Sequence, residues 1–371
     1  MARRGENIHK RKDGRWEGRY IKARTAEGKI QWGYVYGTVY AEVKRVLIQK
    51  KAEAGFYNLK RTDLTFDALA EVWLHSQRNA VKESTYAHYS YTLHKYLLPV
   101  LSKVPVASLE ESFLEQAMQQ IIAPIDAAHK PLGNSSAREC LSMLRRICKY
   151  AAHFHLIRPL EIMVKLPQKS PKVLLPFTTE EQKKLQSFVM DAPTPRKIGL
   201  LLGFQLGLRI GEICGLKWGD FDLSAGTVTI QRTVTRISCG NGHTKVIVQS
   251  PKTQNSHREI PLPKSLLRVL KKLSKDFSSG TWFLSGNEEK PVEPRCYRKS
   301  IYGYLKKASV HQAHPHALRH TFATTCLQAH CDIKTLSELL GHADAAVTLK
   351  KYVHSDMTRK RKEINRVFEN F

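Results

Sequence analysis

The sequence contains no apolar run of the roughly 18 residues that a membrane-spanning helix requires. An apolar stretch at 198–208 ends at Arg209, and the opening residues MARRGENIHKRKDGR lack the apolar core of a secretory signal peptide. The seven cysteines are odd in number and form no CxxC pair, which is typical of reduced thiols in a cytoplasm. We therefore expect a cytoplasmic protein with no membrane partner.

Acidic residues are also scarce, and this limits the chemistry that the chain can perform. Adjacent pairs such as Glu110–Glu111 point apart on a helix, so no convergent set of carboxylates indicates a two-metal nuclease. The phosphate-binding pattern GxxxxGK(S/T) is missing, so nothing indicates use of ATP. We expect neither a metal nor a cofactor.

What the chain has in excess is positive charge. Its 60 Lys and Arg residues outnumber 33 Asp and Glu, which gives a formal net charge of +27 and a pI of about 9.8. Residues 1–61 alone hold sixteen basic and six acidic residues. A surplus that is both large and clustered indicates a polyanionic partner, and double-stranded DNA is the first candidate.

The 371 residues suffice for two or three domains, and changes in composition divide them into three. We expect a multidomain, mainly α protein. It has a small β-sheet plus helix at 1–57, an all-α bundle at 62–158, and an α+β domain with an inserted three-stranded sheet at 177–371. A linker rich in Pro and Lys, 159–176, separates the last two domains.

Alternating residues predict the strands. The segments 15–22 and 30–36 belong to the N-terminal sheet, and 226–232, 245–249 and 258–262 form the inserted sheet. Expected helix starts are the N-cap candidates Ser84 and Ser135, and Thr178 with Glu181 as its capping-box partner.

The N-terminal unit mixes basic and aromatic residues on the same strands, as in a β-sheet laid into a DNA groove. Some of Trp16, Trp32, Tyr34 and Tyr36 are expected to form its small core, while the basic residues between them meet phosphates. The candidates for DNA contact are Arg15, Arg19, Lys22 and Arg24 in this unit, and Lys82 and Arg145 in the helical region.

The segment GLRIGE at 207–212 predicts an anion site. Gly207 can end one helix and let another begin, which places Arg209 near a helix N-terminus with free N–H groups and positive potential. A buried unpaired charge is costly, so an arginine in this apolar segment needs a partner, and Glu212 is the local candidate.

Histidines crowd the segment HPHALRHTFAT at 314–324. His316 and Arg319 lie three residues apart and share one face of a helix, and His342 follows a helix stop at Gly341. Weak zinc candidates, without a nearby carboxylate, are His316 with His320, and Cys326 with His330 and Cys331.

Taken together, these residues resemble the pattern of a known family. The segments GLRIGEICGLKWGDFD, PKTQNSHREIPL, HALRHTFAT and LGHADAAVTLKKYVH are similar in order and spacing to those of the tyrosine recombinases, the lambda-integrase-like family. The helical region resembles that family's core-site-binding domain, and the N-terminal sheet resembles, more loosely, the arm-binding domains of phage and conjugative-transposon integrases. The residues that the resemblance identifies as catalytic are Arg209, Lys252, His316, Arg319, His342 and Tyr352.

The resemblance implies a site-specific recombinase, or integrase, of a phage or integrative mobile element. Tyr352 would attack a phosphodiester to give a 3′-phosphotyrosine, Lys252 would protonate the leaving 5′ oxygen, and the Arg and His residues would hold the phosphate. It also implies a Holliday junction, a homotetramer on core and arm-type DNA sites, and accessory excision or DNA-bending proteins.

Two alternatives remain open: a non-catalytic DNA-binding protein of the same fold, and a type IB topoisomerase-like enzyme that relaxes DNA. The complete set of six residues argues against the first, and the separate basic sheet argues against both. The tail 359–371 places Ile364, Val367, Phe368 and Phe371 on one face of a short helix, which packs either on its own domain or on a neighbouring subunit.

Overall fold

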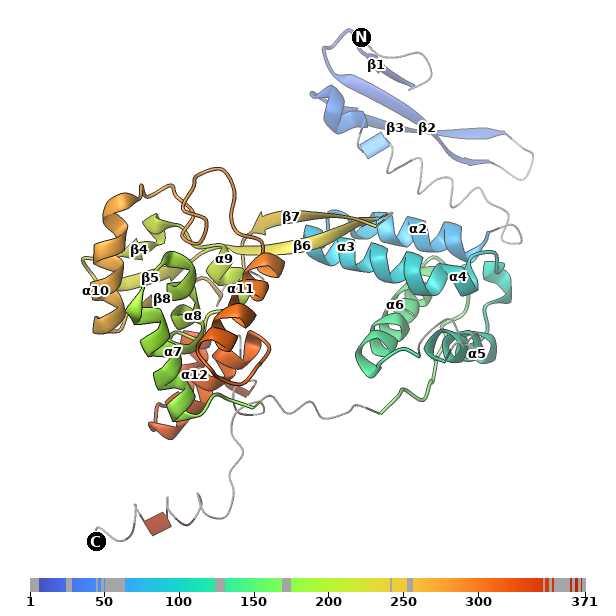
Figure 1. Cartoon of the computed structure of the whole chain (residues 1–371). Coiled ribbons are helices and arrows are strands. Elements are labelled where there is room, and N and C mark those ends of the chain that lie inside the picture. Colours follow the sequence, from blue (N-terminus) through green and yellow to red (C-terminus); the bar gives the residue numbers. More distant parts are fainter. Residues whose placement is uncertain are drawn as a thin grey trace. The chain divides into compact units, whose positions relative to one another are not determined.

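The computed structural model describes residues 7–24, 29–44, 46–47, 50, 64–123, 131–168, 175–240, 242–251, 256–342, 344–346, 349, 361, 364–365 and 368. The chain divides into two compact units, Met1–Pro171 with Ser238–His243, and Lys172–Ile237 with Thr244–Phe371 (Figure 1). The expected fold class is confirmed, because the chain is mainly helical with a small N-terminal sheet and further strands in the second unit. Among the described residues, no helix is both long and apolar enough to cross a membrane.

The N-terminal sheet is antiparallel, with strand order β1-β2-β3. Its strands are β1 (Ile8–Lys10), β2 (Trp16–Arg24) and β3 (Ile30–Gly37). Helical residues at 40–44 cover one face, where Ile8, Val43 and Leu47 form a small buried core.

The aromatic residues of this sheet are divided between its two faces. Trp16 packs on the core and meets Tyr40 edge to face, with ring centroids 4.9 Å apart. Trp32, Tyr34 and Tyr36 alternate with inward-facing residues of β3 and are exposed. Of the four aromatic residues proposed for the core of the sheet, Trp16 thus contributes to it and the other three lie at the surface.

The rest of the first unit is helical and has its own buried core, which includes Phe66, Leu69, Leu97 and Leu144. Its elements are α2 (Phe66–Gln77), α3 (Glu83–Thr92), η1 (Leu93–Leu97), α4 (Leu98–Leu101), η2 (Val106–Ser108), α5 (Glu111–Ile122) and α6 (Asn134–His153).

The expected N-caps at Ser84 and Ser135 are wrong. The helix α3 is capped by Lys82 and α6 by Gly133, so both serines lie in the first helical turn. Elements α3, η1 and α4 follow one another without a break, and η1 is a π-helical turn. Pro99 has no N–H to donate to the carbonyl four residues before it and its ring crowds that carbonyl, so a local change of helix type is expected here.

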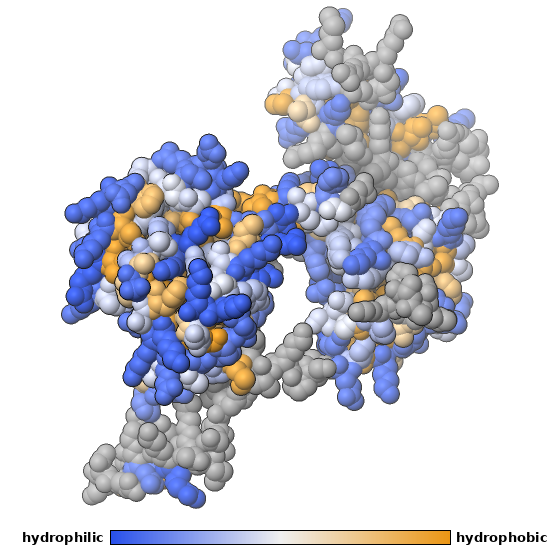
Figure 2. Space-filling model, in the orientation of Figure 1, coloured by the Kyte–Doolittle hydropathy of each residue, from blue (hydrophilic) through white to orange (hydrophobic). Residues whose placement is uncertain are grey.

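The second unit combines helices with two small sheets (Figure 1). Its helical elements are α7 (Thr179–Asp191), α8 (Pro195–Gln205), α9 (Ile210–Cys214), η3 (Trp218–Asp220), α10 (Lys264–Leu273), η5 (Ser274–Asp276), α11 (Pro294–Lys307), α12 (His316–Gln328) and α13 (Ile333–Leu340). Its strands are β4 (Phe221–Asp222), β5 (Thr227–Ile230), β6 (Thr233–Gly240), β7 (His243–Gln249) and β8 (Arg258–Pro261), except that Ser238–His243, where β6 ends and β7 begins, belong to the first unit. Figure 2 shows many hydrophilic side chains, with apolar ones between them, over the visible face of this unit.

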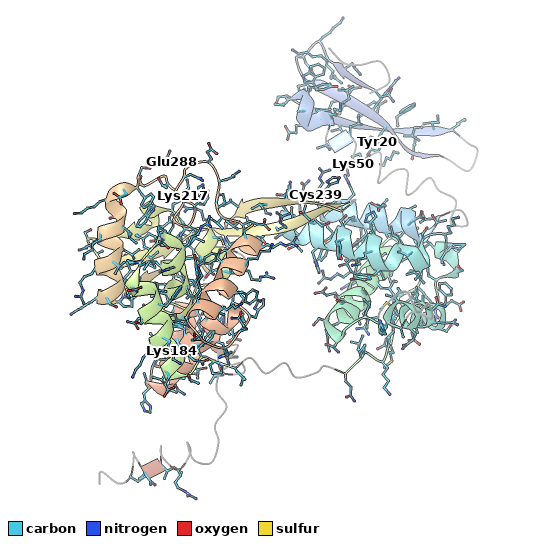
Figure 3. The ribbon with its side chains drawn as sticks, viewed as in Figure 1. Tyr20, Lys50, Lys184, Lys217, Cys239 and Glu288 are labelled. Atoms are coloured by element: carbon cyan, nitrogen blue, oxygen red, sulfur yellow. The ribbon has the colours of Figure 1, made fainter. Side chains whose placement is uncertain are left out.

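The membership of the inserted sheet differs from the sequence prediction. The three-stranded sheet has the order β4-β5-β8, while β7 pairs with β6 in a separate two-stranded hairpin. Most residues of β7 are exposed, so this hairpin lacks the apolar alternation that would have revealed β6. Cys239, which is exposed, lies near the end of β6 (Figure 3).

Helix α8 lies in the core of the second unit and packs against α12. A Cβ atom added at Gly203 would lie 3.1 Å from the Leu318 side chain, so the glycine allows this close approach. The capping box of Thr178 and Glu181 is present at the start of α7, as predicted. The N–H of Phe177 donates to Thr321 Oγ1 at 2.9 Å, which attaches the beginning of this unit to α12.

Candidate functional site

Arg209 stands at the N-terminal end of α9, as the sequence predicts. Gly207 takes a left-handed conformation with φ +66°, which lets the chain turn between α8 and α9. A Cβ atom at Gly207 would lie 2.9 Å from Leu340 and would also collide with the Phe322 ring. Any larger residue would therefore disturb both the turn and its packing.

The expected partner of Arg209 is in place. Glu212 is 3% exposed, and its carboxylate accepts hydrogen bonds from the Arg209 N–H at 2.9 Å and from the Arg209 side chain at 2.7 Å. The side chain of Arg209 is 38% exposed. Glu212 thus fixes a guanidinium that remains open to solvent.

A second arginine, Arg258 at the start of β8, shares the same carboxylate. Two of its side-chain nitrogens donate to Glu212 at 3.2 and 3.0 Å. Burial alone would raise the pKa of the Glu212 carboxyl, but the guanidinium groups of Arg258 and Arg209 hold this pKa below its ordinary value. The sequence analysis did not identify Arg258. The feature of the sequence that could have identified Arg258 is the alternation of inward and outward residues in β8, which places Arg258 on the same inward face as Ile260.

Arg319 is the most deeply buried arginine described, with 1% of its surface exposed. It lies one turn into α12, the helix that begins at His316. Its two terminal nitrogens donate to the carbonyls of Gly207 and Leu340, each at 2.7 Å. These bonds connect α12 both to the turn before Arg209 and to the end of α13.

His342 lies beside this arginine. Helix α13 ends at Gly341, which adopts the left-handed conformation predicted for a helix stop, with φ +62°. The next residue, His342, places its Nε2 atom 2.9 Å from a terminal nitrogen of Arg319. An arginine can only donate, so Nε2 acts as the acceptor and the proton of the neutral ring resides on Nδ1. The structure thus brings Arg319 and His342 into direct contact.

The other proposed site residues stand as follows. His316 lies at the first position of α12 and is partly exposed, and its N–H donates to His314 Nδ1 at 3.2 Å. Lys252 and Tyr352 lie outside the described residues. In the part of the chain that is described, no three His, Cys, Asp or Glu residues gather in a group able to hold a metal ion.

The proposed DNA-contact residues of the first unit differ in their contacts and in their exposure. Arg15 is bound to Asp13 at 2.9 Å, and Arg19 lies over the exposed Trp32 ring at 5.1 Å. Lys22 is exposed and Lys82 is partly exposed, while the side chain of Arg24 lies outside the described residues.

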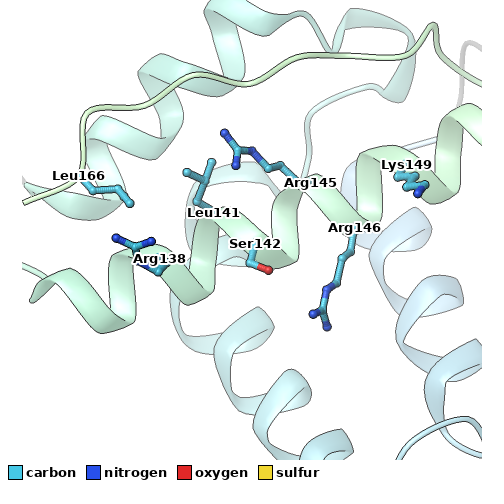
Figure 4. A pocket seen from close by; sticks show the side chains of 7 residues that line it. All are labelled: Arg138, Leu141, Ser142, Arg145, Arg146, Lys149 and Leu166. Carbon is cyan, nitrogen blue, oxygen red and sulfur yellow. The ribbon is translucent and has the colours of Figure 1, made fainter. Parts of the chain in front are cut away.

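Arg145 is held by a neighbouring backbone segment rather than projecting freely. It donates to the Ile162 carbonyl at 3.2 and 2.5 Å. The same face of α6 forms a pocket of about 300 Å³ (Figure 4). Its lining residues are Arg138, Leu141, Ser142, Arg145, Arg146, Lys149 and Leu166. This basic pocket was visible in the sequence only through one of its arginines.

Two family patterns match the sequence. The pattern of the phage integrase family covers residues 176–359, and that of the phage integrase N-terminal SAM-like domain covers 65–122. The first range includes Arg209, Glu212, Arg258, His316, Arg319 and His342, while the basic pocket on α6 lies outside both ranges.

Curated relatives carry related names. A tyrosine recombinase XerC of Bacillus pumilus is 31% identical over 242 residues, which cover 63% of this chain and 76% of that protein. A XerC of Thermodesulfovibrio yellowstonii is 30% identical over 230 residues, 58% of this chain and 70% of that protein. A XerC-like protein of Caldanaerobacter subterraneus subsp. tengcongensis is 30% identical over 221 residues, which span 52% of this chain and 56% of its own length.

Solved structures share the fold. The integrase of the transposon Tn1549, in complex with transposon right end DNA, superposes with a TM-score of 0.67 at 20% identity, covering 82% of this chain and 99% of that one. A lambda integrase dimer bound to a core site gives a TM-score of 0.52 at 16% identity, covering 96% of this chain and 100% of that one. The family patterns and the relatives show that the chain belongs to the phage integrase family of tyrosine recombinases.

Proposed function

We propose that this protein is a site-specific DNA recombinase that cuts and rejoins DNA through a phosphotyrosine at Tyr352. It would integrate or excise a phage or another integrative mobile element. The observation that carries the proposal is the bonding of Arg319. This buried guanidinium touches His342 and the Gly207 carbonyl, two residues before Arg209. Members of the family that the chain matches are named tyrosine recombinases, which supports this activity.

The bonding of this site suits it to hold a phosphodiester. During attack, negative charge grows on the non-bridging oxygens of the phosphate, and fixed guanidinium groups stabilise that charge best. Arg209 and Arg319 would each donate to these oxygens, with His316 and His342 completing the set. Because both arginines already have fixed partners, little reorganisation is needed when the charge develops.

The covalent step would then proceed as follows. The Tyr352 oxygen attacks phosphorus, its proton passes to His316, and the bond to the 5′ oxygen breaks as Lys252 gives that oxygen a proton. The products are a 3′-phosphotyrosine and a free 5′-OH. The phosphotyrosyl bond conserves the energy of the broken phosphodiester, so rejoining would need neither ATP nor a metal ion.

The three regions of the chain would have different roles in recombination. Residues 177–371 would cut and rejoin, 62–158 would bind the core site, and 1–57 would bind a separate arm-type site. Solved structures that share the fold include the Tn1549 integrase in complex with transposon end DNA and a lambda integrase tetramer bound to a Holliday junction. We infer by analogy a homotetramer acting on DNA through a Holliday junction in a bacterial cytoplasm, with accessory excision or DNA-bending proteins.

A trapping experiment tests this function. The full chain is incubated, in excess EDTA, with a nicked duplex from the DNA flanking its gene, so that religation is blocked. The wild-type protein should form a denaturant-resistant protein–DNA complex, while Tyr352→Phe should bind the duplex and form none. Two intact site duplexes should then exchange strands. Relaxation of supercoiled DNA without exchange would favour the topoisomerase-like alternative, and binding without any cutting would favour the non-catalytic one.

A further inference from the structure

The guanidinium of Arg258 contacts two other segments of the second unit and a carbonyl of its own segment. Besides its two bonds to Glu212, it donates through Nε to the Leu339 carbonyl at 2.7 Å and through a terminal nitrogen to the Ser256 carbonyl at 3.2 Å. Only 9% of Arg258 is exposed. Its donors thus connect α9 and α13 and also reach the backbone just before β8, rather than being directed at one partner.

Each of these segments leads to a residue of the proposed catalytic set. Glu212 binds Arg209 directly. Leu339 lies in the last turn of α13, three residues before His342. Ser256 follows Lys252 by four residues along the chain. One side chain therefore connects the supports of Arg209 and His342, two groups that must act on a single phosphate.

The charges at this junction also favour the binding of an anion. Glu212 is one carboxylate shared by two guanidinium groups, so the three side chains together carry one net positive charge. Without Arg258, the Glu212 carboxylate would neutralise Arg209 alone. With Arg258 present, the partly exposed Arg209 keeps positive potential that a phosphate can use.

We propose that Arg258 is a positioning residue, which fixes Arg209 and His342 relative to each other before DNA is cut. This inference rests on the proposed function. Arg258 does not touch the phosphate itself. It acts through Glu212 and through two backbone carbonyls, and it keeps the site in its reactive geometry.

The competing explanation is that Arg258 only neutralises a buried carboxylate. A lysine could do that, because its ammonium is a compact point charge that can pair with Glu212. A lysine could not hold both oxygens of Glu212 and also reach the carbonyls of Leu339 and Ser256, since it lacks the planar fork of donors. The conservative substitution therefore separates the two explanations.

The test compares Arg258→Lys with the wild type in the full chain. Two quantities are measured: the affinity for a half-site, and the single-turnover rate of covalent complex formation on the nicked duplex at saturating protein. We expect unchanged affinity and a rate about 100-fold lower, which is the typical effect of a displacement of about 1 Å in a catalytic group. Arg258→Met should reduce the rate further.

The matched control is Arg232→Lys. Arg232 also binds a buried carboxylate of this unit, Asp220, at 2.6 Å, and it donates to the Gly215 carbonyl at the end of α9 at 3.3 Å, but its side-chain hydrogen bonds reach neither Glu212 nor Leu339. This variant should lose stability to a similar degree and cut DNA at nearly the wild-type rate. If Arg258→Lys cuts as fast as the wild type, or loses no more rate than Arg232→Lys, the positioning role is wrong.

Hydrogen exchange tests the positioning role of Arg258 by a second measurement, which does not depend on the formation of a covalent complex. Arg258→Lys should speed amide exchange in peptides covering 209–212 and 339–342, whereas Arg232→Lys should not. Unchanged exchange in both peptides would contradict the positioning role even if the wild-type chain forms no covalent complex. That lack of a complex would itself count against the proposed function, so the two failures are distinguishable.

Discussion

Two buried arginines of the second unit and three arginines of the first unit lie in different surroundings. In the second unit, Arg258 and Arg319 are buried and donate to backbone carbonyls, to a carboxylate or to a histidine. In the first unit, Arg11, Arg19 and Arg146 lie over the rings of Tyr36, Trp32 and Tyr89, at 5.4, 5.1 and 5.3 Å from their centroids. The two arginines of the second unit are thus buried among hydrogen-bond acceptors, whereas the three of the first unit lie over aromatic rings.

The difference indicates what each group of arginines can control. A buried guanidinium with several fixed acceptors has already lost its rotamer freedom, so it is ready for a reacting phosphate and should determine the rate of chemistry. The Arg19 guanidinium, which lies over the exposed Trp32 ring with no side-chain hydrogen bond to the described residues, can move to a phosphate, so it should determine the affinity for DNA. The following substitutions test this division.

The largest effect is expected at Arg319. Arg319→Lys keeps the charge but cannot donate to Gly207, Leu340 and the substrate together, so covalent complex formation should slow by roughly 100- to 1000-fold. Half-site affinity, measured by fluorescence anisotropy, should change little. Arg196→Lys is the control, because Arg196 donates to a single carbonyl, that of Leu284. A large loss of affinity with an unchanged rate would overturn the division.

The second effect concerns the turn that carries Arg209. Gly207→Ala places a Cβ atom in a left-handed conformation and against the Phe322 ring. We expect a loss of about 2–4 kcal/mol in the free energy of unfolding, measured with urea. Gly303→Ala on α11, where nothing lies within 4 Å of the added atom, should be neutral or stabilising. Equal results for both glycines would show that the turn is not under this constraint.

A smaller effect is expected at Glu181, which is less buried than Glu212. Burial opposes its ionisation, but hydrogen bonds from the backbone N–H groups of His311 and Thr178 and from the His311 ring lower the pKa of Glu181 to about 2. The ionised carboxylate therefore stabilises the fold above pH 4.5, and that stabilisation disappears as the pH falls toward 2.

Glu181→Gln should therefore cost about 1 kcal/mol at neutral pH, as is typical of exposed ion pairs. Its deficit relative to the wild type should shrink between pH 4.5 and pH 2, as followed by thermal unfolding. A deficit that stays constant through this range would mean that the ionised carboxylate is not the source of the stability.

The smallest effects are expected at the stacked arginines. Arg19→Ala should make the plot of log affinity for full attachment-site DNA against log salt shallower by about 0.9, because one phosphate contact is lost. The rate of covalent complex formation on a core site should not change. Arg268→Ala removes the same charge from the exposed face of α10 and should leave the slope unaltered. A slower rate of covalent complex formation in Arg19→Ala would contradict the division between arginines that determine the rate and arginines that determine the affinity for DNA.

The sequence predicted the parts of the site that depend on local rules. Gly207 before Arg209 indicated a helix start, and Gly341 before His342 indicated a helix end. Both are found because they follow from backbone conformations that only glycine adopts easily. The spacing of His316 and Arg319 likewise placed both on α12.

Contacts between distant segments could not be predicted in this way. Arg145 and Arg258 both donate to carbonyls of segments remote in sequence, at Ile162 and Leu339. Nothing in the neighbouring sequence distinguishes such an arginine from one that faces DNA. The strand β6 was not predicted, for another reason. Its partner β7 is largely exposed, so the hairpin has no buried face that requires apolar residues at alternate positions.

The central claim is that Tyr352 becomes joined to DNA, and mapping the joined residue tests it most directly. The covalent complex formed on the nicked duplex in EDTA is digested with protease and nuclease, and the modified peptide is identified by mass spectrometry. Our account predicts a 3′-phosphoryl nucleotide on the peptide containing Tyr352, and none on any other tyrosine. A nucleotide on Tyr302 or Tyr304, or a complex that forms only when a metal ion is supplied, would contradict it.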